Sequence, residues 1–432
     1  MKSWLNIKTL VILFFGIGFL ILNLRLTKLQ YNKKGIDKVI WGDSRGYYEY
    51  LPHLFISQNI TQQVYALPLP NGNTLNKYSS GVATLQAPFF VSLYGYLKIT
   101  GQNPTGYEAS FGWMIAVCTS IYAFIGFCFL FFYLKNRFNV LAAIITCSAL
   151  YLGTNMLYYI KGEPGMAHVY SFFCFSIMLY YLDKFYTEGL RKQHFIIVVT
   201  FFSLAVLIRQ TNIFSVLLIA FYDVYSFNSL KERTFFWWKN SKLIVLSLPI
   251  LLIIHIPQIA YWYSTTGDFF VNGYIVSGEK FSNLVNPKLY DVLLSVRSGW
   301  LPYSWVMVLF FIGIIVGIVK KQAQSVAVLV MFLLIWYICA SWWTWNFACS
   351  YGYRAFIDYY AFFSIPLALI VFEVVRLKYV LIKIPFILFL ALSTYISISL
   401  TLDYTCDWCE ENWKTKDYKK LVKSYFTNEN EK

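Results

Sequence analysis

A segment that combines acids, an arginine and aromatic rings, VIWGDSRGYYEYLPHLF, begins at Val39 and offers the clearest candidates for chemistry. Its Asp43 could take a proton from a hydroxyl or amine nucleophile, or hold a divalent cation through its oxygens. The alternative is structural, because Asp43 or Ser44 could cap the amino end of a helix formed by the following residues. Glu49 would lie on a different face of that helix, so the two acids are not an obvious pair.

A second acid, Glu163, stands in the short stretch KGEPGMAH, where Lys161 and His168 flank it. Acids and bases beside an apolar bundle are costly unless they are paired or functional, which makes these residues candidates for a site. The alternative is a solvated loop with a Pro-Gly turn. His168, at the start of the next apolar run, would then be a structural histidine.

Three arginines stand at the ends of apolar runs: Arg209 in LIRQTN, Arg297 in LLSVRSGWLPYS and Arg354 in YGYRAFIDYY. Guanidinium groups match phosphate oxygens two at a time, so three of them around one mouth suggest an anionic ligand such as a lipid phosphate or diphosphate. Tyr353 adjoins the last of them. The alternative is that each arginine pairs with lipid headgroups or with a nearby acid; those acids are Asp268, Glu279 and Asp358.

Two cysteines near the end of the chain, Cys406 and Cys409, form a C-x-x-C pair. A lone pair cannot complete a structural zinc site, and an extracytoplasmic position makes a disulfide between them the favoured prediction over unpaired thiols. Cys349 is a third cysteine expected on the same side of the membrane.

The composition places these residues in a membrane protein. Hydrophobic residues make up 58% of the 432 positions, charged residues only 13%, and the mean hydropathy is +0.54. The 20% aromatic share suits rings at membrane–water interfaces. The net charge of +15 is spread over many short loops, so it fits membrane sidedness and not nucleic-acid binding.

The apolar runs predict an all-α bundle of about eleven transmembrane helices, since a span needs about 20 apolar residues. The two shortest runs are joined by RQTN and could form a re-entrant hairpin. The eleven runs cover residues 4–24, 113–133, 140–160, 166–182, 195–208, 213–224, 242–263, 304–319, 325–345, 356–375 and 380–400.

Sidedness follows from the short loops. LKNRFN, DKFYTEGLRKQH, NSLKERTFFWWKNSK, VKKQ and RLK are rich in Lys and Arg, which predicts a cytoplasmic amino terminus and a retained first span. The domain 1–401 would then carry extracytoplasmic loops at about 25–112 and 264–302, with interfacial helices in both. Residues 402–432 would form a short tail on the same side, with a helix over DYKKLVKSYF.

The segments WGDSRGYYEYLPHLF, YSSGVATLQAPFFVSLYGYL, GMAHVYSFFCFSIMLYY, LAVLIRQTN, LLSVRSGWLPYS and SYGYRAFIDYYAFFSIPLAL occur in an order that resembles the GT-C glycosyltransferases. The likeness is to bacterial multi-pass members related to protein O-mannosyltransferases and aminoarabinose transferases. It runs from about the first span to the tenth.

This resemblance implies a hexosyl- or pentosyltransferase that uses a polyprenyl-phosphate-linked sugar on the outer face of a bacterial inner membrane. The acceptor would be a lipid, a glycan or a protein. The resemblance maps the catalytic carboxylate onto Asp43 and, less closely, a second acid onto Glu163. The resemblance also allows Mg²⁺ or Mn²⁺ held by these two acids as a cofactor, since some members of the family use a metal ion and others do not. The residues expected around the substrate are Arg45, Tyr47, Lys161, His168, Arg209, Arg297, Tyr353 and Arg354.

A transporter or flippase of a lipid-linked sugar is the main alternative, because it would use the same arginines and the same bundle. Transporters often show inverted repeats and broken helices near the midplane. No repeat is evident, and the acids cluster in external loops. The sequence therefore favours an enzyme whose site lies at the outer surface.

Overall fold

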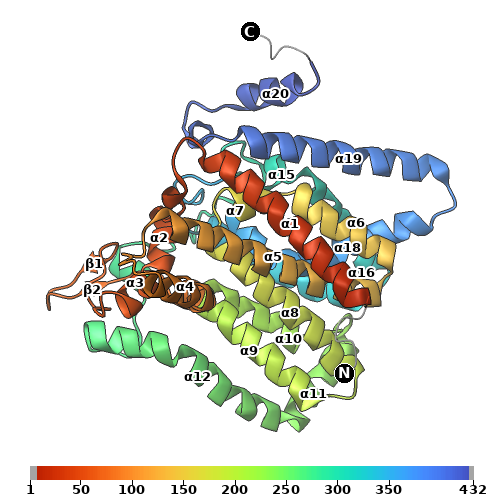
Figure 1. Ribbon diagram of the computed structural model, residues 1–432. Helices are drawn as coiled ribbons and strands as arrows, with labels where there is room; N and C mark the ends of the chain where they lie inside the picture. Colours follow the sequence, from red (N-terminus) through yellow and green to blue (C-terminus); the bar gives the residue numbers. More distant parts are fainter. Residues whose placement is uncertain (1–6, 428–432) are drawn as a thin grey trace.

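The computed structural model describes residues 7–427, and almost all of its regular structure is helical (Figure 1). Within this range the sheet structure is one small hairpin, in which β1 (Leu67–Pro68) pairs antiparallel with β2 (Thr74–Leu75). An all-α membrane architecture is therefore confirmed.

The centre of the bundle is formed by α5 (Ala109–Arg137), α8 (Ala167–Thr187), α9 (Lys192–Ile208) and α18 (Tyr360–Arg376). Most side chains of α8 and α18 are buried, so these helices are enclosed by protein on all sides. Other helices surround them, namely α1 (Ile7–Tyr31), α6 (Val140–Leu152), α16 (Val308–Val319) and α17 (Ala323–Ala340).

Two long helices lie at opposite edges of the bundle in Figure 1, α12 (Ser241–Thr266) and α19 (Val380–Asp403). Both expose leucine and isoleucine side chains, as expected for helices that face lipid. By length and hydropathy, five described helical segments could cross a membrane: Val11–Tyr31, Ala109–Arg137, Ser241–Thr266, Arg354–Arg376 and Val380–Asp403. Shorter apolar helices fill the space between them.

Residues 4–6 of the first predicted span lie outside the described residues; otherwise the predicted spans correspond to helices, with two departures in continuity. The run at 140–160 breaks after α6 and continues as the short α7 (Met156–Lys161). The run at 213–224 contains only η2, a 3₁₀ turn over Gln210–Ser215, and α10 (Val216–Ala220). A segment of that length reaches less than about 20 Å, so it cannot cross the hydrocarbon core alone.

A helix that the apolar runs did not predict, α4 (Gly81–Ile99), stands within the first long loop. It contains Pro88 and packs against α5 and α9. The same loop contains η1 (Ile36–Val39), α2 (Gly42–Tyr48) and α3 (Tyr50–Phe55), which with the hairpin form one end of the molecule (Figure 1). The expected helices in this loop are present, and more than half of their side chains are buried.

The second long loop and the tail supply the remaining short elements. The loop contains α13 (Gly273–Val276), α14 (Leu289–Leu294), α15 (Trp300–Tyr303) and η3 (Trp305–Met307), and the segment between α17 and α18 ends in η4 (Arg354–Tyr359). The amphipathic α11 (Phe227–Lys239) precedes α12. In the tail, η5 (Cys406–Cys409) and α20 (Thr415–Ser424) follow α19, and the helix expected near the end of the chain is present.

The tail packs back onto the bundle. The Trp305 indole N–H donates to the Tyr418 hydroxyl of α20 at 2.9 Å. The disulfide joins Cys349 to Cys409, which corrects the predicted pairing of Cys406 with Cys409. Cys406 is free and exposed, because Cys409 is bonded to Cys349 in the segment before α18 and not to Cys406.

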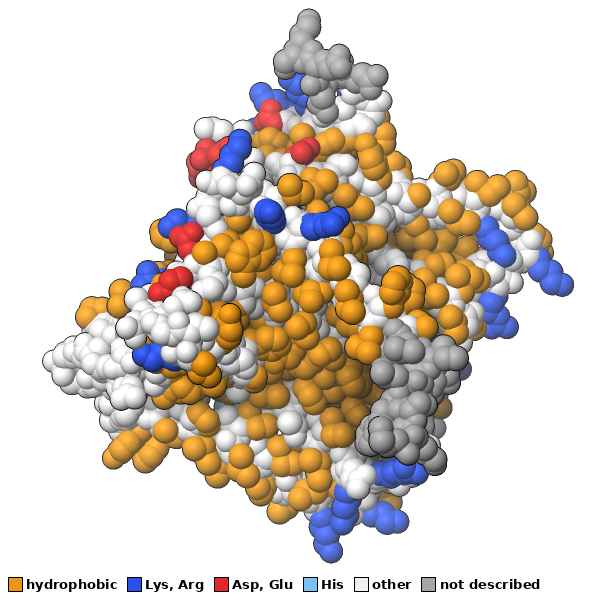
Figure 2. Space-filling view, viewed as in Figure 1, with side chains coloured by type: hydrophobic (Ala, Val, Ile, Leu, Met, Phe, Trp, Pro, Cys, Tyr) orange, Lys and Arg blue, Asp and Glu red, His pale blue; other side chains and the backbone are white. Residues whose placement is uncertain are grey.

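The surface shows an uneven distribution of charge. In the view of Figure 2, hydrophobic side chains cover most of the molecule, and Asp and Glu gather at the upper left. Lys and Arg stand without acids along the lower and right edges. The end of the molecule with α2, α3 and the hairpin is therefore distinct from the basic end.

Candidate active site

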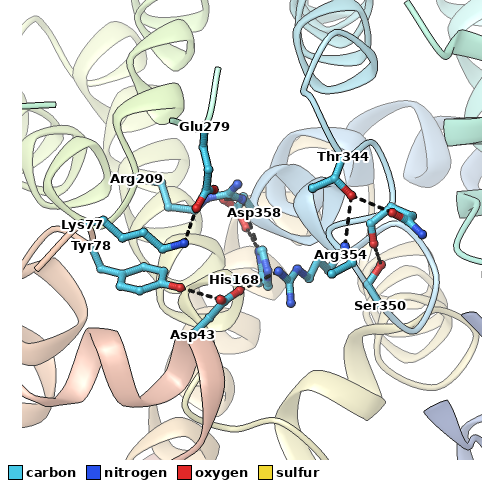
Figure 3. A network of polar contacts seen from close by, with 12 residues as sticks. Asp43, Lys77, Tyr78, His168, Arg209, Glu279, Thr344, Ser350, Arg354 and Asp358 are labelled. Carbon is cyan, nitrogen blue, oxygen red and sulfur yellow. Dashed lines mark hydrogen bonds and ion pairs between the residues drawn. The ribbon is translucent and has the colours of Figure 1, made fainter. Parts of the chain in front are cut away.

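Asp43 is the second residue of α2, and its carboxylate does not cap the helix. Its Oδ1 accepts a hydrogen bond from the Tyr78 hydroxyl at 2.6 Å, and its Oδ2 accepts one from Arg354 Nη2 at 2.6 Å (Figure 3). Ser44 does not cap either, since its hydroxyl donates to the Val39 carbonyl at 2.7 Å. The capping interpretation of this segment is thus wrong, and the carboxylate takes part in long-range contacts.

Two glycines let the chain approach α2 closely enough for these contacts. A Cβ on Gly46 would lie 2.1 Å from the ring of Tyr78, so only glycine allows that ring to lie on the helix and reach Asp43. A Cβ on Gly165 would lie 1.6 Å from the Ser44 hydroxyl oxygen. The GEPG turn therefore packs directly against the helix that carries Asp43.

The second polar group is centred on Asp358, which is fully buried. His168 Nδ1 lies 2.6 Å from its Oδ1, and Arg209 Nη1 donates to its Oδ2 at 3.0 Å. The short helix η4 carries both Arg354 and Asp358, so one element supplies a partner to each group. Figure 3 shows His168 between the Asp358 carboxylate and the Asp43–Arg354 pair.

A third pair closes the same region from the two long loops. Lys77, beside Tyr78, forms an ion pair with Glu279 of the second loop, and both side chains are largely buried. The Lys77 ammonium also lies 5.2 Å from the ring centre of Tyr78 and 5.7 Å from that of Tyr274. These contacts join the first loop to the second above Asp43.

These groups line a cavity of about 620 Å³. Its polar lining includes Asp43, Tyr47, Lys77, Tyr78, His168, Arg209, Glu279 and Arg354. The remaining lining is mostly apolar or aromatic, with Ile213, Phe214, Ile275, Phe281, Leu284, Ile338, Trp342, Trp343 and Phe347. Several of these apolar residues are half exposed, with Ile213 at 50%, Leu284 at 49% and Trp343 at 50%.

The pKa of the two acids is shifted in opposite directions. Burial alone would raise the pKa of Asp43, but the Arg354 guanidinium, the Tyr78 hydroxyl and Lys77 together hold it below its ordinary value. Burial raises the pKa of Glu163, and the nearby Asp43 carboxylate adds to this while Arg354 opposes it. Asp43 is therefore ionised at neutral pH, and Glu163 takes up a proton more readily than a solvated glutamate.

Half of the residues expected at the site line this cavity: Asp43, Tyr47, His168, Arg209 and Arg354. The other five lie elsewhere. The Glu163 carboxylate accepts a hydrogen bond from Tyr158 at 3.3 Å outside the lining. The Lys161 ammonium donates to the Gln30 side chain of α1 at 2.8 Å, so Lys161 extends toward α1.

Three more of the expected residues lie away from this cavity. Arg45 faces away from Asp43 across α2 and pairs with the buried Glu49 at 3.0 Å. Arg297 Nε donates to the Cys409 carbonyl at 3.3 Å. This arginine therefore contacts the tail and does not line the cavity with Arg209 and Arg354. Tyr353 is fully buried and packs against the ring of Phe356 with centroids 4.9 Å apart.

Sequence reasoning missed Tyr78 and Lys77 and treated Asp358 and Glu279 only as ion-pair partners. Nothing in their spacing relates them to Asp43, since Tyr78 is 35 positions away and Arg354 is 311 positions away. The only signal was the placement of Lys77 and Tyr78 in the long external loop.

The residues present do not fit a resident divalent cation at Asp43. No group of three or more His, Cys, Asp or Glu side chains placed to hold a metal ion occurs among residues 7–427. Both Asp43 oxygens accept hydrogen bonds, one of them from a guanidinium that would repel a cation.

The fold and the site together define an all-α, polytopic membrane protein with a charged cavity between its two long loops. No protein-family model matches the sequence, and no curated protein matches it either. Among solved structures, the chain is similar to ArnT from Cupriavidus metallidurans bound to undecaprenyl phosphate. That match has a TM-score of 0.59 at 12% identity and covers 95% of this chain and 69% of that one. The apo form of the same protein matches with a TM-score of 0.55 at 12% identity, over 94% of this chain and 75% of that one.

Proposed function

We propose that this protein is a membrane glycosyltransferase that moves a sugar from a polyprenyl-phosphate donor to an acceptor. The observation that carries the proposal is the Asp43 carboxylate, fixed by Arg354 and Tyr78 inside the cavity. We call the charged and polar residues of the lining the cavity floor and its apolar and aromatic residues the cavity wall. The structurally similar ArnT was crystallised with undecaprenyl phosphate, which supports a lipid-phosphate donor.

The shape of the cavity suits a ligand with a charged head and an apolar tail. Arg209 and Arg354 lie on the floor, and each guanidinium has five N–H donors, more than its carboxylate partner uses. The remaining donors can bind phosphate oxygens. The half-exposed Ile213 and Leu284 on the wall would contact the prenyl chain where the cavity meets the membrane.

The reaction proposed is an inverting displacement at the anomeric carbon. Asp43 orients the acceptor or accepts its proton, and the two arginines stabilise the negative charge that develops on the departing lipid phosphate. Aromatic rings such as Trp342 and Tyr47 would pack against the sugar ring. No step of this reaction is assigned to a metal ion, because the residues around Asp43 do not fit one. The sugar would be a hexose or pentose, and the acceptor a lipid, a glycan or a protein.

The site is proposed to face the extracytoplasmic side of a bacterial inner membrane. The loops rich in Lys and Arg would lie in the cytoplasm together with the amino terminus. The bare Lys and Arg side chains along one edge of Figure 2, and the acids at the other, support this orientation.

The first test compares purified Asp43→Asn with the wild type on a panel of undecaprenyl-phosphate-linked hexoses and pentoses. Binding of undecaprenyl phosphate and release of sugar would both be recorded. We expect the variant to bind the lipid but to release sugar at least about 100-fold more slowly. A wild type that cleaves none of these donors but moves one across a vesicle bilayer would be a flippase, and the enzyme proposal would be wrong.

A further inference from the structure

We infer that His168, oriented by Asp358, is the group that takes the proton from the acceptor hydroxyl, while Asp43 holds that hydroxyl in place. This inference rests on the proposed transferase function and assigns the proton to a residue other than the carboxylate on α2. It begins from the hydrogen bonds that Asp43 already makes.

Asp43 is poorly placed to act as the base. Tyr78 occupies one carboxylate oxygen and Arg354 the other, each at 2.6 Å. Both contacts favour the ionised carboxylate, and they hold its pKa low after burial has acted in the opposite direction. Two fixed donors therefore hold this carboxylate as a hydrogen-bond acceptor, and a proton on either oxygen would compete with one of them.

The hydrogen bonds around His168 define its tautomer. Its shortest contact is from Nδ1 to Asp358 Oδ1 at 2.6 Å, and the other oxygen of the same carboxylate accepts from Arg209 at 3.0 Å. Arg209 Nη1 also lies 3.4 Å from Nδ1, but a guanidinium is only a donor, so this contact adds nothing to the network. The arrangement is satisfied when Nδ1 carries a proton and donates it to Asp358.

That tautomer leaves the lone pair on Nε2. Every hydrogen bond of the imidazole within residues 7–427 goes through Nδ1. Only 4% of the His168 side chain is exposed, and this side chain lines the cavity. Nε2 is therefore the ring atom that remains to meet a ligand.

The charges explain why a proton would be taken up here during the reaction. Arg354 faces Asp43 and Arg209 faces Asp358, so the formal charges of the cavity floor cancel before a ligand binds. A phosphodiester donor carries one negative charge, and the phosphate monoester that it releases carries about 1.5 to 2 at neutral pH. A proton on His168 supplies the compensating charge at the moment when the phosphate gains it.

The step balances without any further reactant. The acceptor oxygen forms a bond to the anomeric carbon, and the bond from that carbon to the phosphate oxygen breaks. The electron pair of the broken bond leaves with the lipid phosphate. The hydroxyl proton moves to His168 Nε2, and Asp358 stabilises the imidazolium through Nδ1 in the manner of an acid that orients a histidine base.

The test uses full-length His168→Gln and His168→Ala, with His53→Gln as the control. His53 is also buried and also makes a hydrogen bond through Nδ1, in its case with the Asn59 carbonyl at 3.0 Å, but it lies outside the cavity. Each protein would be assayed for binding of undecaprenyl phosphate and for sugar release from the donor panel. We expect both His168 variants to bind the lipid within about threefold of wild type and to lose about 100-fold or more in sugar release.

Rescue separates a catalytic role from a structural one. Imidazole added to His168→Ala should restore part of the sugar release, and it should not change the His53→Gln control. Sugar release by His168→Gln within threefold of wild type would overturn the inference and leave the proposed function intact. A wild type that releases sugar from no donor would instead remove the proposed function, and this inference with it.

Chemical modification of wild-type His168 tests the same role without relying on a variant that folds. Diethyl pyrocarbonate acylates the free nitrogen of a neutral imidazole, and peptide mapping can locate it among the 4 histidines of the chain. We expect His168 to react and to be protected by undecaprenyl phosphate. An unreactive His168, or one that the lipid does not protect, would show that Nε2 does not face the ligand.

Discussion

Arg354 Nη2 donates a hydrogen bond to Asp43 Oδ2 at 2.6 Å, joining two residues that are 311 positions apart in the chain. The contact brings the first long loop against the segment before α18, and it sets the charge state of the carboxylate. The same short helix continues to Asp358, which fixes Arg209 and His168. The short helix η4 therefore supplies a residue to both acidic groups of the cavity.

Arg209 and Arg297 should differ sharply in lipid binding, although the sequence places both at the ends of apolar runs. Arg209→Gln removes a guanidinium from the cavity floor, and hydrogen bonds to a charged group contribute about 1.5–3 kcal/mol. We expect its affinity for undecaprenyl phosphate to fall about 10- to 150-fold. Arg297→Gln should change it by less than threefold, because its contact is to the Cys409 carbonyl. Equal losses in calorimetric titrations would contradict this arrangement.

Gly46→Ala should damage the site through Tyr78. The added Cβ would lie 2.1 Å from that ring, so the ring must move away from Asp43. We expect sugar release to fall at least about tenfold, with the overpacking costing roughly 1–3 kcal/mol of stability. The matched control is Gly95→Ala in α4, where a Cβ meets nothing within 4 Å. That change should keep activity and slightly raise the melting temperature, because alanine favours a helix over glycine.

The stability of Glu163→Gln relative to wild type should depend on pH. The folded protein raises the pKa of Glu163, so the ionised carboxylate opposes folding. This destabilisation is absent below the pKa of the unfolded chain, about 4.3, and grows as the pH rises above it. Glutamine removes this effect, so the variant should melt above wild type at neutral pH and equal it near pH 4.

Asp43→Asn should show the opposite trend. The pKa of Asp43 is lowered in the folded protein, so its charge contributes stability that is present above about pH 4 and is lost as the pH falls through the lowered value. The variant should therefore melt below wild type at neutral pH and approach it in acid. Thermal unfolding of the three proteins in detergent from about pH 2 to about pH 7.5 measures both trends, because the Asp43 contribution is lost only below about pH 4, and parallel curves over this whole range would contradict them.

The disulfide should be found between Cys349 and Cys409 by peptide mapping without reduction. It links segments 60 positions apart and ties the tail to the chain that leads into Arg354. Cys409→Ser should lower the free energy of unfolding by about 2–4 kcal/mol, a typical value for a lost disulfide. Cys406→Ser is the control and should have little effect, since that thiol is free and exposed. A linked peptide that contains Cys406 would show that the pairing is wrong.

The sequence predicted the fold class because its apolar runs exceed the membrane thickness, a constraint that needs no knowledge of packing. It did not predict α4, whose proline and polar end residues interrupt the apolar pattern. It also left open whether residues 213–224 cross the membrane or form half of a re-entrant hairpin, and the chain there forms a 3₁₀ turn and a helix of only 5 residues.

For the site, the sequence alone identified the residue types and the loops: an acid among aromatic rings, and arginines where membrane sidedness disfavours them. Which of them meet was decided only by the tertiary structure. Side chains find their partners through contacts between distant loops, and neither Tyr78 nor Asp358 has a spacing that points to Asp43 or Arg209. The cysteines show the same limit, because proximity in sequence favoured Cys406, whereas the packing of the tail brought Cys409 to Cys349.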